Sequence, residues 1–223
     1  MIAMGKLIVI EGLDGSGKGT QAALLLENLK KSGKDVFEID LPNYSDNSSA
    51  LVKMYLAGEM GTHPCDVNAF AASSFFAVDR YASFKKFWRR EYESGKILVA
   101  NRYTTSNACH QMTKLEKKDW DLFLSWLFDF EYQKLEIPKP DCVIFLDMPV
   151  DVSQKLLSKR YHNDNSKKDV HERDVEYLKN CREAALYACE KLGWQKIPCA
   201  ENGDPKSVEE ISRLVFETAV RFI

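Results

Sequence analysis

Short apolar runs alternate with longer amphipathic stretches along the whole chain. The runs are rich in valine, isoleucine and leucine and are bounded by glycine or polar residues. This pattern is typical of strands that are buried on both faces of a parallel sheet. The predicted strands span residues 6–11, 35–41, 96–101, 142–147 and 195–199.

The stretches between these strands carry apolar residues at intervals of three and four, which is the spacing of one helix face. They predict helices at residues 20–32, 48–57, 66–94, 119–133, 150–160, 172–192 and 207–222. The alternation predicts an α/β fold in three layers, a five-stranded parallel sheet flanked by helices. Ligands of such folds lie outside the carboxyl ends of the strands, so functional residues are expected directly after strands.

A glycine-rich turn containing a lysine follows the first predicted strand and precedes the first predicted helix. Glycines let the backbone turn without Cβ clashes, and the N–H groups of such a turn converge on phosphate oxygens. The alternative is a plain glycine turn, but the strand–loop–helix context favours a P-loop NTPase fold that binds a nucleoside triphosphate. The residues predicted to bind it, which the family resemblance described below identifies as an ATP site, are Gly12, Leu13, Asp14, Gly15, Ser16, Gly17, Lys18, Gly19 and Thr20.

The residue after Lys18 departs from the usual P-loop pattern. Gly19 stands where most P-loops carry the Ser or Thr whose hydroxyl binds Mg²⁺. Thr20 comes one position later, so either Thr20 binds the Mg²⁺ that accompanies ATP, or water and phosphate hold it. The variant resembles the loop of nucleoside monophosphate kinases.

Composition narrows the class of protein. With 223 residues, of which 45% are hydrophobic and 29% charged, the chain fits one globular domain over residues 1–223. A net charge of −2 argues against a dedicated nucleic-acid-binding protein. The sequence contains no apolar run of membrane-spanning length, and no signal peptide or membrane association is expected. Six cysteines without C-x-x-C or zinc spacing indicate reduced thiols in a cytoplasmic protein.

Two further groups of residues suggest a second substrate. Phe76 and Arg80 are four residues apart on a predicted helix and therefore share a face. An aromatic ring beside a guanidinium suits a flat, hydrogen-bonding base, although a core aromatic beside a solvated arginine is the alternative. Arg102 directly follows the third predicted strand, where a guanidinium can bind an anion.

In their order along the chain, these motifs resemble the thymidylate kinase family. The anchors are the phosphate loop, the segments 41–44 (LPNY), 76–80 (FAVDR), 101–107 (NRYTTSN) and 140–147 (PDCVIFLD), and the stretch 169–172 (DVHE). The resemblance implies transfer of the γ-phosphoryl group of ATP to dTMP, giving dTDP and ADP in dTTP biosynthesis. It also implies a homodimer, and the apolar helices at 66–94 and 119–133 suit an interface.

The resemblance assigns roles around the base and sugar of dTMP. Phe76 would stack on thymine, Arg80 would donate to a thymine carbonyl, and Asn107 would pair with the ring edge. Asp14 would face the 3′-hydroxyl, and Tyr103 would stand near the 2′ carbon and exclude a ribose hydroxyl.

The resemblance also assigns roles around the phosphates. Tyr44 and Arg102 would bind the acceptor phosphate, and Lys18 would bridge the phosphates as charge develops during transfer. His110 stands near the deoxyribose as a packing or hydrogen-bonding residue rather than a general base. The other histidines are predicted to lie on the surface.

The polar segment between the helices at 150–160 and 172–192 is either a plain surface loop or a short lid at about residues 160–171. Basic residues there would close over the ATP phosphates, since the phosphate loop has no arginine of its own. Arg160 is the first choice as a catalytic residue. The further candidates are Lys167, Lys168 and Arg173; solvated, expendable charges are the alternative.

Asn101 replaces the aspartate that the family has before the arginine of the third strand, so the Mg²⁺ site is less negative than usual. Asp14, Asp147 or Glu172 could compensate. No metal ligand is directly assigned, and Thr20 and Glu172 are the possible ones. The competing functions are another nucleoside monophosphate or deoxynucleoside kinase, a P-loop regulatory nucleotide-binding protein, or an inactive scaffold. A regulatory GTPase needs Asn-Lys-x-Asp to specify guanine, and the sequence lacks it.

Overall fold

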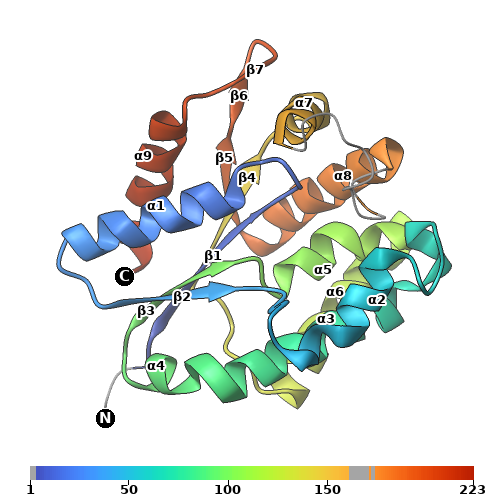
Figure 1. Cartoon of the computed structure of the whole chain (residues 1–223), viewed down its shortest axis with the longest axis horizontal. Helices are drawn as coiled ribbons and strands as arrows, with labels where there is room; N and C mark the ends of the chain where they lie inside the picture. Colours follow the sequence, from blue (N-terminus) through green and yellow to red (C-terminus); the bar gives the residue numbers. More distant parts are fainter. Residues whose placement is uncertain (1–3, 161–170, 172–173) are drawn as a thin grey trace.

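The computed structural model describes residues 4–160, 171 and 174–223, with the exception of the Arg160 side chain. Five strands form one parallel sheet in the order β2-β3-β1-β4-β5 (Figure 1). They are β1 (Lys6–Gly12), β2 (Val36–Asp40), β3 (Ile97–Asn101), β4 (Cys142–Asp147) and β5 (Gln195–Pro198). The predicted five-stranded parallel sheet is confirmed, with strand ends within one residue of the expected positions.

The central strand shows why the sheet needs helices on both faces. The side chains from Leu7 to Ile10 are completely buried. Leu7 and Val9 belong to one hydrophobic cluster, whereas Ile8 and Ile10 belong to another, because successive residues of a strand point to opposite faces. Each face therefore supports its own core.

Helices cover the two faces unequally. α1 and α9 pack on one face, and α3, α5, α6 and α8 lie on the other (Figure 1). The α-helices are α1 (Lys18–Lys31), α2 (Ala50–Ala57), α3 (Ala69–Ser83), α4 (Arg89–Glu93), α5 (Thr105–His110), α6 (Trp120–Phe128), α7 (Val150–Arg160), α8 (Val175–Leu192) and α9 (Val208–Ala219). Within the described residues, no helix is long and apolar enough to cross a membrane.

The long helix predicted at 66–94 is interrupted by a π-helical turn, and the one predicted at 119–133 ends in such a turn. Both findings correct the expectation of continuous α-helix. η3 (Phe84–Trp88) separates α3 from α4, and η6 (Asp129–Lys134) continues α6. The apolar periodicity of 3.6 residues cannot distinguish an α-helical turn from a π-helical turn. A π-helical turn often marks a functional site. The remaining short helices are 3₁₀ turns at η1 (Asn47–Ser49), η2 (Pro64–Asp66), η4 (Met112–Lys114), η5 (Lys117–Asp119) and η8 (Val220–Phe222).

Two small elements were not predicted. α5 begins directly after β3 and is too short to show a periodic pattern. β6 (Ala200–Glu201) and β7 (Asp204–Pro205) form an antiparallel hairpin whose turn residues Asn202 and Gly203 both have positive φ, at 52° and 85°. Asn-Gly is the preferred pair for such a turn, so the signal for this hairpin was present in the sequence.

Candidate active site

The phosphate loop is shaped by glycines that no other residue could replace without strain. Gly15 and Gly17 have φ of +79° and +85°, a region that L side chains rarely adopt. A Cβ on Gly15 would also lie 2.6 Å from the Ser153 carbonyl oxygen of α7. The loop leads directly into α1 at Lys18, and the unpaired N–H groups of a first helical turn attract anions.

Lys18 is buried inside this loop. Its Nζ donates to the Leu13 carbonyl at 2.8 Å and lies 3.6 Å from Oδ1 of Asp14. Burial, and then the positive charge of Arg102, lower the pKa of Lys18 to about 8. Burial acts to raise the pKa of Asp14, but Arg102 and Lys18 outweigh it and hold that pKa well below its usual range.

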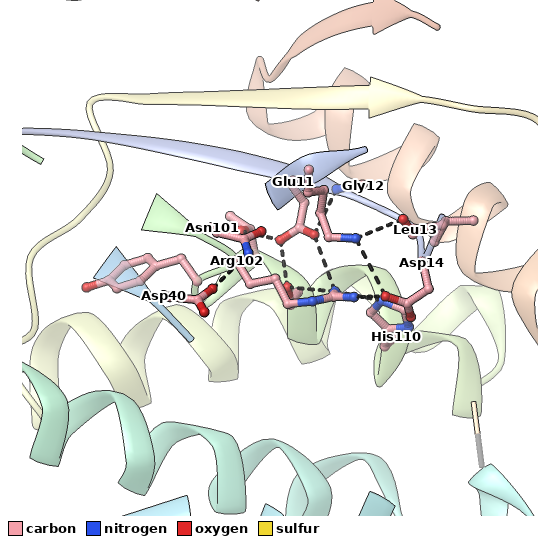
Figure 2. A network of polar contacts seen from close by, with 12 residues as sticks. Glu11, Gly12, Leu13, Asp14, Asp40, Asn101, Arg102 and His110 are labelled. Carbon is pink, nitrogen blue, oxygen red and sulfur yellow. Dashed lines mark hydrogen bonds and ion pairs between the residues drawn. The ribbon is translucent and has the colours of Figure 1, made fainter. Parts of the chain in front are cut away.

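Arg102 joins the phosphate loop to α5. Its backbone is left-handed, with φ of 67°, a strained conformation that clusters at functional sites. One Nη forms an ion pair with Asp14, and the other lies 3.3 Å from Nε2 of His110 (Figure 2). The predicted acceptor-phosphate residue therefore lies beside the phosphate loop.

Glu11 is a buried carboxylate that the sequence analysis missed. It has no exposed surface, and it accepts hydrogen bonds from the Thr105 and Ser106 hydroxyls at 2.9 and 2.7 Å. It also lies 3.9 Å from Arg102. Glu11 thus fixes the start of α5 against the end of β1. The available signal was a charged residue within an apolar strand.

A second buried carboxylate holds the residues that are predicted to recognise the base. Nε and Nη2 of Arg80 each donate to a Glu131 oxygen at 2.6 Å, and Nη1 donates to the Tyr103 carbonyl at 3.3 Å. Burial acts to lower the pKa of Arg80, but the charge of Glu131 outweighs it and raises that pKa. Asn107 also donates to Glu131, at 3.3 Å. Arg80 is therefore not a solvated arginine.

One cavity of about 880 Å³ joins the predicted donor and acceptor residues. Its walls include the phosphate loop from Asp14 onward and also Phe76, Arg80 and Asn107. Phe76 is half-buried and stands edge-on to Tyr55, with ring centroids 6.2 Å apart. The other predicted acceptor-site residues that line the cavity are Tyr44, Arg102, Tyr103 and His110.

The placement of Tyr103 corrects its predicted role. The residue has no exposed surface, its hydroxyl donates to the Pro138 carbonyl at 2.8 Å, and its ring packs beside Trp88. The side chain therefore belongs to the core, and its carbonyl oxygen holds Arg80. A tyrosine occupied with these contacts does not stand against the 2′ carbon of a sugar.

The prediction that His171 lies on the surface is also wrong. His171 is 5% exposed, lines the cavity and stacks on His110, with the rings 8° from parallel and 5.6 Å apart. Its Nε2 lies 2.7 Å from the Tyr55 hydroxyl. Burial lowers the pKa of His171 to about 3 and that of His110 well below its usual value, so both rings are neutral at pH 7. His63 is exposed as predicted, and His162 lies outside the described residues.

The residues near Gly19 include oxygen donors suited to Mg²⁺. Nδ2 of Asn101 donates to Asp40 at 2.8 Å (Figure 2), whereas Oδ1 of Asn101 is buried with no hydrogen-bond partner. A carboxylate and an orphaned amide oxygen are the hard ligands that Mg²⁺ prefers. Thr20 is exposed. In the described part of the chain, no group of three or more His, Cys, Asp or Glu residues could hold a metal ion.

Several predicted lid residues cannot be placed. Glu172, Lys167, Lys168 and Arg173 lie outside the described residues, as does the side chain of Arg160. Only the backbone of Arg160 is described, at the end of α7, the helix whose Ser153 carbonyl oxygen abuts Gly15.

A parallel sheet with a glycine-rich phosphate loop, and a cavity lined also by buried residues that are predicted to recognise a base, are typical of a P-loop kinase of nucleoside monophosphates. The thymidylate kinase family model matches residues 10–211. The chain belongs to the thymidylate kinase family, and it is accordingly an ATP-dependent nucleoside monophosphate kinase.

Individual relatives agree with this assignment. A probable thymidylate kinase of Thermococcus gammatolerans is 32% identical over 212 residues, covering 94% of this chain and 93% of the relative. Thymidylate kinase of Mycobacterium tuberculosis is 28% identical over 186 residues, covering 82% and 84%. The solved thymidylate kinase of Candida albicans matches with a TM-score of 0.70 at 20% identity, over 98% of this chain and 92% of that one, and supports the fold.

Proposed function

We propose that the protein transfers the γ-phosphoryl group of ATP to dTMP, giving dTDP and ADP, as one nucleoside monophosphate kinase domain in dTTP biosynthesis. One observation carries this proposal: a single cavity contains both the phosphate loop and the Arg80–Asn107 pair. A donor triphosphate and an acceptor base can therefore occupy the same space.

At the donor end, the phosphate loop and the first turn of α1 bind the ATP phosphates. Lys18 is already directed into the loop by its bond to the Leu13 carbonyl. On ATP binding its charge stabilises the negative charge that develops during transfer. Because phosphoryl transfer needs little covalent chemistry, alignment and charge neutralisation supply most of the rate enhancement.

At the acceptor end, Phe76 stacks on thymine while Arg80 and Asn107 bond its edge. Arg102 and Tyr44 bind the phosphate of dTMP. Arg102 is held by Asp14 beside the loop. The acceptor phosphate therefore displaces this carboxylate from the guanidinium of Arg102. Asp14 then bonds the 3′-hydroxyl. The two substrates are in this way brought into line for transfer.

Asn101 and Asp40 would hold the Mg²⁺ that accompanies ATP, through their oxygens or through bound water. The bound ion would supply positive charge against the phosphates of ATP. Arg160, at the end of α7, is the proposed basic residue of the lid. The backbone of Arg160 lies at the end of the helix that packs against Gly15.

The enzyme is proposed to be a homodimer. Phe70, Tyr81 and Phe87 of α3 and η3 are 39%, 39% and 48% exposed, and Leu122 of α6 is 69% exposed. Two other aromatic residues of the stretch 66–94, Phe84 and Trp88, are instead buried in the core. Exposed apolar side chains on adjacent helices suit a second copy of the chain. Sedimentation of the wild type and of Leu122→Glu tests this, and a monomeric wild type contradicts it.

A cytoplasmic location is proposed from cysteine chemistry. All six cysteines are free, and five of them are buried. Buried, unpaired thiols suit a reducing compartment. Fractionation of the native cells tests this proposal, and recovery of the enzyme outside the cytoplasm contradicts it.

Steady-state phosphotransfer to a panel of monophosphates tests the activity. We expect kcat/KM for dTMP to exceed the values for UMP, dCMP and AMP by a large factor. Equal turnover of AMP would contradict the acceptor assignment and favour another nucleoside monophosphate kinase. Nucleotide binding without phosphotransfer would favour a regulatory protein.

A further inference from the structure

Glu131 lies behind the base-recognising residues without facing the cavity itself. Its side chain has no exposed surface, whereas Arg80 and Asn107 line the cavity. Its two oxygens accept hydrogen bonds from both of these residues. One carboxylate thus fixes the orientation of the two side chains that would meet a base.

The orientation of the Asn107 amide follows from its partners. Nδ2 lies 3.3 Å from the Ser73 carbonyl oxygen and 3.3 Å from Glu131 Oε1. A carbonyl and a carboxylate can only accept, so the NH₂ group must point toward them. The amide oxygen remains for a ligand in the cavity, and this end of the cavity presents a hydrogen-bond acceptor.

Arg80 complements this acceptor with donors. A guanidinium has five N–H groups; two are taken by Glu131 and one by the Tyr103 carbonyl. Two N–H groups therefore remain without a hydrogen-bond partner among the described residues, and they can donate to a ligand carbonyl. The bidentate bond to Glu131 fixes the plane in which they lie.

We propose that Glu131 is a positioning residue that selects thymine over cytosine. The amide oxygen of Asn107 can accept from the ring N–H of thymine, and the N–H groups of Arg80 can donate to the carbonyl beside it. Cytosine has the reverse pattern, a bare ring nitrogen beside an amino group, and leaves buried polar groups unpaired. The inference rests on the proposed phosphorylation of dTMP and adds the residue that sets the polarity of base recognition.

The test is Glu131→Gln, assayed with dTMP and 5-methyl-dCMP. These acceptors share the methyl group and differ only at ring positions 3 and 4. An amide at 131 can donate toward Asn107, so only the Ser73 carbonyl still holds the NH₂ group and the orientation of the Asn107 amide is less strongly fixed. We expect the kcat/KM preference for dTMP to fall by roughly tenfold or more, through opposite changes in the two KM values rather than in kcat.

A second variant covers the possibility that Glu131→Gln does not fold, because Arg80 would then be a buried charge with weaker compensation. Glu131→Asp keeps the charge but withdraws the carboxylate from both partners. Its preference should lie between those of the wild type and Glu131→Gln. An unchanged preference in the folded variants, or a parallel loss with both acceptors, would overturn the proposal.

A matched control separates selection from stability. Arg182 forms a two-point ion pair with Asp147, at 2.8 and 3.1 Å. We expect Arg182→Gln to lower Tm but to leave the preference between the acceptors unchanged. If the wild type does not prefer dTMP at all, the proposed function fails. If it does and the Glu131 variants keep that preference, only the inference about Glu131 fails.

Discussion

The two ends of the cavity, which are proposed to bind the phosphoryl donor and the acceptor, are built from different groups. The donor end is mainly backbone, with glycines of positive φ and the start of α1. The acceptor end consists of side chains held by the Arg80–Glu131 and Arg102–Asp14 ion pairs. Substitutions at the donor end should therefore act through loop shape and a single charge, whereas substitutions at the acceptor end should act through buried charges and their partners.

The largest expected effect is loss of turnover in Lys18→Ala and Arg102→Ala, one variant at each end. Each removes a charge that is proposed to neutralise phosphate during transfer, and kcat should fall by roughly 10³-fold or more. Arg89→Ala, which breaks an exposed pair with Glu93, is the control and should remain active. Near-normal kcat and KM in Arg102→Ala would show that it does not bind the acceptor phosphate.

Arg80→Ala tests the acceptor end of the cavity through the stability of the fold. The substitution leaves Glu131 as a buried carboxylate without its counter-charge, and the free energy of unfolding should fall by about 3–5 kcal/mol. Acceptor discrimination should weaken as well. Urea denaturation measures the first effect, with Arg89→Ala again as control. If Arg80→Ala lowers the free energy of unfolding by no more than Arg89→Ala does, then Glu131 does not depend on Arg80 as its counter-charge.

The pH dependence of ATP binding tests the donor end alone. In the nucleotide-free enzyme the pKa of Lys18 is about 8, so the lysine loses its proton as pH rises through that value. Phosphate favours the charged form, so ATP affinity should fall above about pH 8, with proton uptake on binding. Calorimetry in buffers of different ionisation heat measures the uptake.

Lys18→Arg is the matched control for this titration, because a guanidinium remains charged throughout the range. Proton uptake in this variant should be absent or much smaller. Equal uptake by the wild type and Lys18→Arg would assign the titration to another group.

The smallest expected effect is at Gly19. A Cβ there would meet Nδ2 of Asn101 at 3.8 Å, an ordinary contact. Gly19→Ser therefore adds the missing hydroxyl at little steric cost. The Mg²⁺ concentration for half-maximal activity should fall by roughly threefold to tenfold. Gly19→Ala adds the Cβ alone and should leave this Mg²⁺ concentration unchanged. The same shift in both variants would exclude the hydroxyl as the cause of the shift.

The same contrast explains what could be predicted from the sequence. The strand, glycine turn and helix around the phosphate loop were predicted because such a turn is encoded by neighbouring glycines. Tyr103 and His171 were misplaced because their surroundings depend on Pro138, Trp88 and Tyr55, which are distant in the sequence. No local pattern records such contacts.

Glu11 and Glu131 were missed for a different reason. Each is a charged residue within an apolar pattern, and Glu131 continues the buried spacing of Phe123 and Leu127 along α6. A charge at a core-facing position costs energy unless it is paired. Such residues could have been identified from the sequence as candidates for an internal ion pair, although their partners could not.

The bond between Asp14 and Arg102 also has a consequence for how the substrates influence each other. Asp14 belongs to the ATP-binding loop, yet its carboxylate is paired with the guanidinium expected to receive dTMP. An acceptor phosphate that displaces Asp14 changes the charge balance around Lys18, and ATP at Lys18 changes the strength of the Asp14–Arg102 pair. Thermodynamic linkage requires these influences to be equal. The factor by which dTMP changes the dissociation constant of ATP must equal the factor by which ATP changes that of dTMP.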